Sequence, residues 1–167
     1  MKTIGIFTIF ILVCTAAFSQ EINIRRDAET MGKALVDKDY ANYVNFTYPK
    51  ILKDMGGKEK MIVTIKKQMD DVNAQGAHIV SISFDKPSVI VKEKNELQAT
   101  VPQTVIFETA NGKMEARNTL IAISADDGVH WYFIDPGERD LETVRITLPN
   151  LSKKLILAPS EPIKQLK

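Results

Sequence analysis

An Asn-Gly pair separates two long stretches of alternating apolar and polar residues in this chain. The first stretch reads ELQATVPQTVIFETA (residues 96–110), and the second reads KMEARNTLIAIS (residues 113–124). Alternation with a period of two places successive side chains on opposite faces of a strand. Asn-Gly suits the two central positions of a tight hairpin turn, because both residues tolerate a positive φ. The sequence therefore predicts a long antiparallel hairpin that turns at Asn111 and Gly112.

A two-residue turn also predicts which residues of the hairpin lie opposite one another. The expected pairs are Ala110 with Lys113, Phe107 with Ala116, Val105 with Asn118, and Gln103 with Leu120. The pairs from Phe107 onward share one face with Leu97, Ala99, Val101, Met114 and Ala122. The opposite face carries Lys113, Glu115, Arg117, Thr104 and Glu108, and we expect it to be the wetter one.

A third strand, VHWYFID (residues 129–135), follows a second tight turn at Asp126, Asp127 and Gly128. If Asp127 and Gly128 form a two-residue loop, Ser124 faces Trp131, Ala122 faces Phe133, and Leu120 faces Asp135. A three-residue turn would invert the strand and put His130 and Tyr132 inside. The apolar set Val129, Trp131 and Phe133 favours the first register.

In that register the inner face is apolar except for Gln103, Asn118 and Asp135. Burying a carboxylate and two amides costs several kcal/mol unless they find hydrogen-bond partners. They could bond one another or line a wet cavity, which makes them candidate pocket residues. In the alternative interpretation, Asp135 caps the strand end before Pro136 and Gly137, and backbone or water satisfies both amides.

The first third of the chain is predicted to be helical. Expected helices are residues 27–37, capped by Asp27, a short one capped by Asp39, a third starting at Pro49, and residues 58–73. The last carries an apolar stripe of Met61, Ile62, Ile65, Met69 and Val72. Strands follow at residues 78–84 and 88–93. After Pro136 we expect a short helix that Pro149 ends, and then an extended segment with a loose tail. The pattern predicts an α+β domain with helices on the concave face of a strongly bent antiparallel sheet.

The N-terminus reads MKTIGIFTIFILVCTAAFSQ, with one lysine, a short apolar run and small residues at Ala17 and Ser19. This is typical of a secretory signal peptide (residues 1–19) cut before Gln20. The sequence then predicts one exported domain over residues 20–150 and an extended tail over 151–167, in the periplasm or secreted. The alternative is a lipoprotein anchored through Cys14, but Val13 lies where a small residue is expected. Without that anchor, no stable membrane attachment is expected after cleavage.

Composition excludes several classes of function. Cys14 is the only cysteine, so the mature chain would have no disulfide and no thiolate ligand. The 22 Lys and Arg nearly balance 21 Asp and Glu, without a basic stripe, so no nucleic-acid partner is expected. No phosphate-binding loop, metal-ligand spacing or serine-nucleophile motif is present, and His78 and His130 stand alone. We therefore expect neither a metal nor a cofactor.

The order of these elements resembles that of the nuclear-transport-factor-2-like superfamily, which has a cystatin-like α+β cone. The resemblance covers about Arg25 to Asp135. It rests on DYANYVNFTYPKILKDMGGKEKM leading into a long helix, then a meander that ends in a tryptophan-containing strand. It is closest in kind to small exported bacterial members of unknown function. The segment TYPKILKDMGG departs from the short hairpin of many members. The resemblance implies a cone-shaped cavity, in which enzymatic members place an acid–base pair; here Asp135 with Tyr43 or Tyr48 has the right residue types.

Three functions remain open from the sequence. The favoured one is a non-catalytic exported module that binds a small apolar or amphipathic molecule, or a protein partner. The alternative is a small isomerase, dehydratase or cyclase with Asp135 as general base. A third is a homodimer formed through the outer sheet face around Thr104, Ile121, Ile123 and Tyr132. Fold alone does not choose between them.

Overall fold

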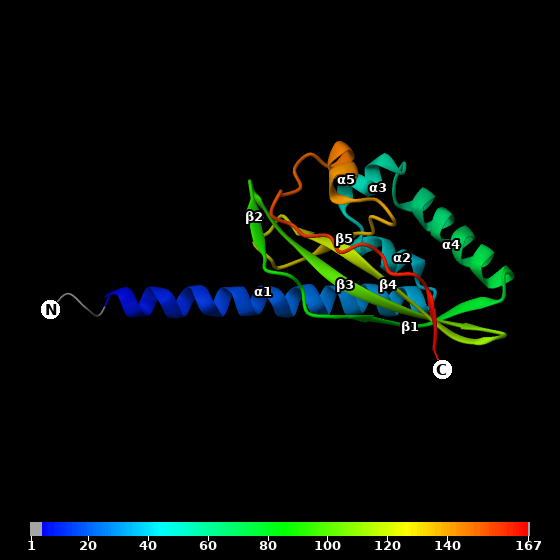
Figure 1. The fold of residues 1–167 in the computed structure, drawn as a ribbon. Coiled ribbons are helices and arrows are strands. Elements are labelled where there is room, and N and C mark those ends of the chain that lie inside the picture. Colours follow the sequence, from blue (N-terminus) through cyan, green and yellow to red (C-terminus); the bar gives the residue numbers. More distant parts are fainter. Residues whose placement is uncertain (1–4, 167) are drawn as a thin grey trace.

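A computed structural model describes the backbone of residues 5–166 and the side chains of residues 19–166. Helices lie on one face of a strongly curled antiparallel sheet, and a short helix with the C-terminal segment covers part of the other face (Figure 1). The predicted fold class is therefore confirmed. Among the described residues, no helix combines the length and the apolar character needed to cross a bilayer.

The first helix, α1 (Gly5–Val36), is continuous through the position where a new helix was expected to start. Asp27 is therefore not an N-cap, and that prediction was wrong. Instead the buried Asp27 carboxylate accepts the backbone N–H of Trp131 at 2.9 Å and the Arg26 Nε–H at 2.8 Å. No proline or glycine interrupts the chain just before Asp27, so the helix has no reason to begin there. The side chains of the predicted signal segment up to residue 18, Cys14 included, lie outside the described residues.

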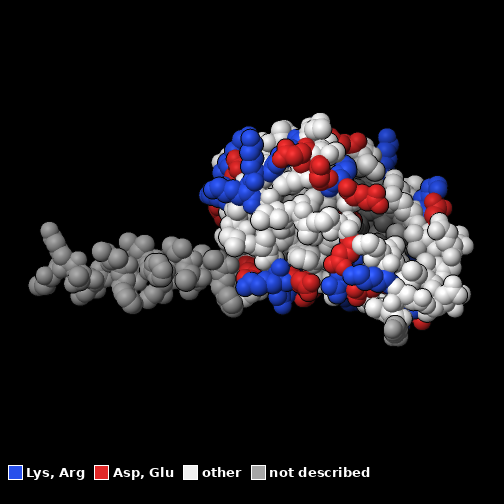
Figure 2. Space-filling view, viewed as in Figure 1, with Lys and Arg blue, Asp and Glu red and all other residues white. Residues whose placement is uncertain are grey.

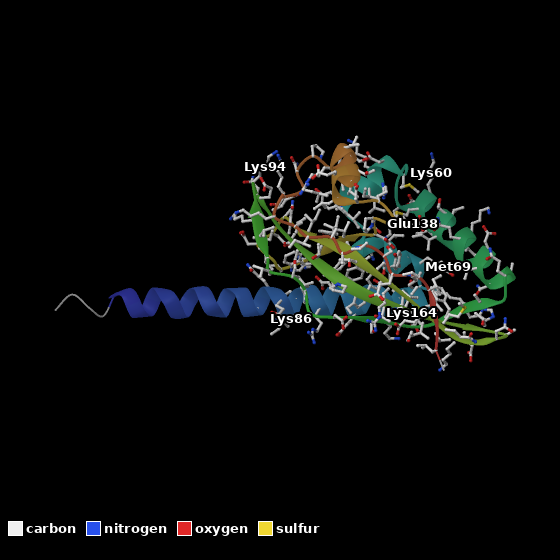
Figure 3. The ribbon with its side chains drawn as sticks, in the orientation of Figure 1. Lys60, Met69, Lys86, Lys94, Glu138 and Lys164 are labelled. Carbon is white, nitrogen blue, oxygen red and sulfur yellow. The ribbon has the colours of Figure 1, made fainter. Side chains whose placement is uncertain are left out.

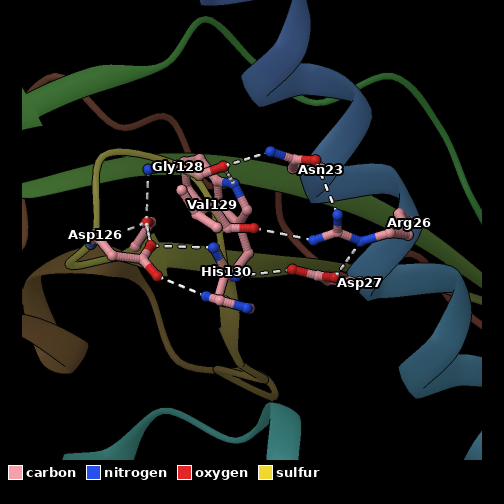
Figure 4. A network of polar contacts seen from close by, with 9 residues as sticks. Asn23, Arg26, Asp27, Asp126, Gly128, Val129 and His130 are labelled. Carbon is pink, nitrogen blue, oxygen red and sulfur yellow. Dashed lines mark hydrogen bonds and ion pairs between the residues drawn. The ribbon is translucent and has the colours of Figure 1, made fainter.

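Polar groups on α1 fix it to the turn between the last two strands of the meander (Figure 4). Asn23 Nδ2 donates to the Gly128 carbonyl at 2.8 Å, and an Arg26 guanidinium N–H donates to the Val129 carbonyl at 2.9 Å. Gln20 Nε2 donates to the Asp127 carbonyl at 3.1 Å. These bonds satisfy backbone carbonyls of a turn that the sheet leaves unpaired.

The next three helical segments are short, and the sequence predicted their boundaries well. They are α2 (Tyr40–Tyr43), the 3₁₀ turn η1 (Val44–Phe46) and α3 (Pro49–Asp54). Asp39 caps α2 by accepting the Asn42 N–H at 3.1 Å, as expected. Gly56 and Gly57, with φ of 86° and 100°, take the left-handed turn between α3 and α4. The long helix α4 (Lys58–Ala74) buries Ile65 and half-buries the rest of its stripe.

The sheet is a meander of four strands, and two short strands pair beside it. Its strands are β1 (Ala77–Phe84), β2 (Val91–Glu93), β3 (Glu96–Thr109), β4 (Gly112–Ser124), β5 (Tyr132–Ile134) and β6 (Lys164–Gln165). The order is β1-β3-β4-β5, with β2 beside β3 and β6 beside β4. All of these pairs are antiparallel.

The β3–β4 register differs from the predicted one by two residues. Thr109 pairs with Gly112, so the turn residues are Ala110 and Asn111 rather than Asn111 and Gly112. Gly112 has a φ of 107°, whereas Asn111 is not among the residues with positive φ. A type I′ turn needs positive φ at both central residues, so that turn is not formed. Thr109 contributes locally, because its hydroxyl accepts the Asn111 N–H at 3.2 Å and donates to the Gly112 carbonyl at 2.8 Å.

The shift of two keeps every side chain on its predicted face, because the period of a strand is two. The shift changes which residues are cross-strand neighbours. Gln103 lies directly opposite Asn118, and Val101 rather than Gln103 lies opposite Leu120. Between β4 and β5, Ala122 faces Phe133 as predicted. His130 therefore stays outside, and the register that would put His130 and Tyr132 inside is excluded. Val129 was assigned wrongly to the inner face: it precedes β5 and is 52% exposed.

The sheet has an apolar core on each face. The inner core packs α1 against β3, β4 and β5, and its members are Ile24, Ala28, Met31, Leu97, Ala99, Val101, Leu120, Ala122, Trp131 and Phe133. The outer core packs α5 (Leu141–Thr147) and the segment after it against Ile121, Ile123 and Ile134. Pro149 follows α5 as predicted, because proline cannot continue a helix.

The chain's own C-terminal segment covers residues of the outer sheet face that were expected to be exposed. Ile121 and Ile123 are 0% and 1% exposed, since the chain's own Leu148, Leu151 and Leu155 pack in the same cluster. These two residues are therefore not part of an exposed apolar patch, while a homodimer through this face stays a prediction. The C-terminal segment is extended but not loose: β6 pairs with β4, and the Leu166 N–H donates to the Lys113 carbonyl at 2.8 Å.

Candidate functional site

A cavity of about 490 Å³ opens between the inner face of the sheet, α1, α4 and the C-terminal segment. The sheet, both helices and the C-terminal segment all contribute apolar side chains to its wall. The main apolar side chains are Met31 and Leu35 of α1, Met61 of α4, Ile79 and Ile82 of β1, Val105 and Phe107 of β3, Ala116 and Leu120 of β4, and Phe133 of β5. A concave, mostly apolar space with a few polar groups is the usual form of a small-molecule site.

The structure brings four of the five predicted pocket residues to this cavity. Tyr43, Gln103, Asn118 and Asp135 all line it. Tyr48 does not line it, and its inclusion was wrong. It packs against the outer core, and its hydroxyl donates to Glu96 Oε1 at 2.7 Å. Thr47 forms a bridge with Phe133, so the next residue along this extended chain points away from the cavity.

Asp135 lies at the end of β5 and is exposed. Its Oδ2 accepts Asn118 Nδ2–H at 3.1 Å, and its Oδ1 accepts the Gly137 N–H at 2.8 Å. Both interpretations drawn from the sequence are therefore present at once: Asp135 caps the strand end and also bonds one of the two amides. The carboxylate stands at the rim of the cavity rather than inside it.

Tyr43 is half-buried, whereas the other titratable residues that line the cavity are exposed. Burial, and then the negative charge of Asp135, raise the pKa of Tyr43 to about 12. The phenol therefore keeps its proton at neutral pH and offers a hydrogen-bond donor. Tyr43 is the last residue of α2, the short helix that Asp39 caps, and its side chain packs against the inner core.

Gln103 is a buried polar residue on the cavity wall. It is 8% exposed, and no described residue hydrogen-bonds its amide. Thr47, which sequence reasoning missed, is 7% exposed and lines the same cavity, again with no described partner for its hydroxyl. Thr47 precedes the Tyr-Pro pair that ends η1, a local signal for a turn but not for a pocket.

Charged residues surround the mouth of the cavity. Glu138 and Arg139 from the segment after β5, and Glu161 from the C-terminal segment, are exposed lining residues. Figure 3 shows Glu138 between the sheet and α4 in this view, and Figure 2 shows acidic side chains beside a hollow on the same face. Arg117 also lines the cavity, but its Nε–H donates to Glu115 Oε1 at 2.8 Å.

The two histidines lie away from the cavity. His78 Nδ1 is 2.7 Å from Asn73 Oδ1, and His130 Nδ1 is 2.7 Å from Asp126 Oδ2 in the β4–β5 turn. Among the described residues, no three histidine, cysteine, aspartate or glutamate side chains come together in a way that could hold a metal ion.

No protein-family model matches this chain, and no curated protein sequence matches it either. Among solved structures, a protein from Catenulispora acidiphila is 16% identical, with a TM-score of 0.43, over 79% of this chain and 98% of that one. A structure from the same organism in complex with S-DNPA is 14% identical, with a TM-score of 0.40, over 67% and 90%. Aln2 from a Streptomyces species is 16% identical, with a TM-score of 0.42, over 75% and 93%. With identities of 14–16% and TM-scores below 0.5, these structures do not indicate what this chain binds or does.

Proposed function

We propose that this protein is a binding module that holds a small apolar or amphipathic molecule in the cavity under its helices, without catalysis. One observation carries the proposal: the cavity has an apolar wall, yet it leaves the buried polar side chain of Gln103 without a described partner. Polar groups inside proteins are nearly always hydrogen-bonded. A ligand with an apolar body and a polar group would satisfy both parts of this wall.

The position of Asp135 argues against the alternative of an isomerase, dehydratase or cyclase. A general base works best when it lies within hydrogen-bond reach of a substrate that is shielded from water. Asp135 is exposed, and both of its carboxylate oxygens already accept hydrogen bonds. Tyr43 would still supply a proton donor beside it, so Asp135→Asn separates the two functions. A binding module keeps its ligand in this variant, whereas an enzyme would lose turnover.

The same proposal includes export and membership of the nuclear-transport-factor-2-like superfamily. The superfamily assignment is supported by the order of the helices and by the curled sheet. Export with cleavage after Ser19 is supported by the small residues before Gln20. Among the residues whose side chains are described, the contacts of α1 with the β4–β5 turn come from Gln20, Asn23 and Arg26, so such a cut would leave these contacts in the mature chain. Mass spectrometry of the protein recovered outside the cytoplasm tests the cut, and a mature chain that keeps residues 1–19 would refute it.

The binding function is tested by filling the cavity. Ala116 lies on the wall, opposite Val105 on β3, so Ala116→Trp should occupy much of the space. We expect this variant to bind the uncharged fluorescent probe N-phenyl-1-naphthylamine at least about tenfold more weakly than the wild type. Ala110→Trp, in the exposed turn of the same hairpin, is the matched control and should bind as the wild type does. Equal probe affinity in both variants would overturn the proposal.

A further inference from the structure

The buried polar residues of the cavity wall carry uncharged hydrogen-bonding groups, whereas its charged residues are exposed at the rim. Gln103 has an amide with two donors and an acceptor, and the structure gives it no described partner. Within the described residues, no fully buried side-chain nitrogen or oxygen is left unpaired. The amide atoms of Gln103 must therefore retain some contact with open space. Gln103 lines this cavity and also a smaller pocket of about 130 Å³ beside Pro102 and Thr104, so the larger space available to its amide is the cavity.

Three further uncharged groups lie on the same wall. Thr47 contributes a hydroxyl from a residue that is 7% exposed, and Tyr43 contributes a phenol that stays protonated because its pKa is raised to about 12. Asn118 uses its Nδ2–H on Asp135, which leaves its carbonyl oxygen as an acceptor. The wall thus offers donors and acceptors together.

The two cations among the described lining residues lie at the rim of the cavity, where each is exposed. Arg117 donates to Glu115, and the Arg139 Nε–H donates to the Pro136 carbonyl at 2.9 Å, so both guanidinium groups are held at the rim. An anionic head group would lose its hydration and would meet a lining in which the carboxylates of Asp135, Glu138 and Glu161 outnumber the two arginines. A cationic head group could meet Asp135 at the rim, but it has no acceptor to offer the Gln103 N–H groups.

We propose, on the basis of the ligand-binding function above, that the ligand carries an uncharged head group that both donates and accepts hydrogen bonds, such as a hydroxyl or a primary amide, and that Gln103 selects this head group. Only such a group satisfies Gln103 and Thr47 without leaving a buried charge unpaired. The apolar chain of the ligand then lies along Val105, Phe107 and Leu120.

The experiment compares three ligands with the same ten-carbon chain. Decan-1-ol, decanoate and decylamine are each titrated at pH 8 against the full-length folded protein loaded with N-phenyl-1-naphthylamine. We expect the alcohol to displace the probe at a concentration at least about tenfold lower than the acid or the amine, the effect of roughly one well-made hydrogen bond. In Gln103→Leu, which keeps the side-chain volume similar, the preference for the alcohol should fall about tenfold. Thr47→Val, a second isosteric change, should reduce it in the same direction.

Gln68→Leu is the matched control, because Gln68 is exposed on α4 and does not line the cavity. It should keep the full preference for the alcohol. Decanoate or decylamine binding as tightly as decan-1-ol, or an unchanged preference in Gln103→Leu, would overturn the inference while leaving the binding function intact. A wild-type protein that does not bind the probe at all would overturn both.

Discussion

Two glutamines on the same strand show how the opposite faces of this sheet use the same side chain. Gln98 is 0% exposed on the outer face, where its amide donates to Glu96 and to the Asn150 carbonyl and accepts the Ser152 N–H. Gln103 is nearly as buried on the inner face, but it has no described partner. Gln98 therefore holds the C-terminal segment in place, whereas Gln103 is available to a ligand.

Replacing each glutamine by leucine should separate these roles. Gln98→Leu leaves the Ser152 N–H and the Asn150 carbonyl without their partner, so we expect it to lower the free energy of unfolding by about 1–3 kcal/mol. Gln103→Leu removes an unpaired amide from an apolar wall and should leave stability nearly unchanged or slightly higher. Urea denaturation of the ligand-free variants measures both. Similar losses in the two variants would contradict the assignment of Gln103.

Asp126 in the β4–β5 turn should make stability depend on pH in the acid range. Burial opposes its ionisation, but hydrogen bonds from the His130 backbone and ring and from Ser124 outweigh that effect and lower the pKa of Asp126 to about 2, from 3.8. A lowered pKa in the folded state stabilises the protein above pH 3.8, and this contribution is lost as the pH falls towards 2. The difference in unfolding free energy between wild type and Asp126→Asn should therefore shrink from about pH 5 to about pH 2. A difference that stays constant over this range would show that the carboxylate charge is not involved.

At the scale of elements, the contact between α1 and β1 depends on one glycine. A Cβ at Gly32 would lie 2.9 Å from Phe84 Cε2 and 3.2 Å from Ile82 Cγ2, which is closer than side-chain carbons normally approach. The helix can therefore lie against the strand only because position 32 has no side chain. The sequence offers no local reason for this glycine, since glycine inside a helix is unfavourable.

Gly32→Val should destabilise the protein even though valine suits a helix better than glycine. Overpacking a well-packed contact costs about 1–3 kcal/mol, which exceeds the gain in helix propensity of less than about 1 kcal/mol. Thermal or urea unfolding checks this, with Lys33→Val at the neighbouring exposed position as the control. An equally stable Gly32→Val variant would mean that α1 packs further from β1 than the structure shows.

The hairpin shows which part of an element could be predicted and which could not. Alternation identified both strands and the face of each side chain, and these assignments survive because the register error was an even number of residues. The exact pairing failed, because it depends on the conformation that Ala110, Asn111 and Gly112 adopt together with the Thr109 hydroxyl. The sequence therefore predicted the polar cluster, and hydrogen bonds within it as one possibility, but not that Gln103 lies directly opposite Asn118.

At the scale of the whole molecule, the C-terminal segment completes both faces of the sheet. Leu151 and Leu155 close the outer core, and further along, Ser160, Glu161 and Ile163 line the cavity. The segment is held by the Glu161 N–H, which donates to the Arg117 carbonyl at 3.1 Å, and by the pairing of β6 with β4. The extended pattern of this segment carries no strong local signal, so the sequence predicts only a tail here.

Two truncations should distinguish these roles. A chain that stops after Leu157 keeps both buried leucines, so it should stay folded but release N-phenyl-1-naphthylamine faster, since the cavity loses part of its rim. A chain that stops after Asn150 loses about 1.5–3 kcal/mol for each buried leucine and exposes Ile121 and Ile123, so it should unfold readily or aggregate. Stopped-flow dissociation and urea denaturation measure the two effects. If the shorter chain were as stable as the longer one, the outer core would not need this segment.

The sequence by itself determined the type and order of the elements from α2 to α5, the face that each side chain of β3 and β4 occupies, and the grouping of Gln103, Asn118 and Asp135. These features follow from local periodicity, from caps such as Asp39 and from breakers such as Pro49. The tertiary structure alone decided that Asp27 bonds the Trp131 N–H, that Tyr48 points away from the cavity, and that the chain's own C-terminus covers Ile121 and Ile123. Most of those contacts join residues far apart in the sequence, and their energies depend on packing and on the burial of polar groups, which no local pattern encodes.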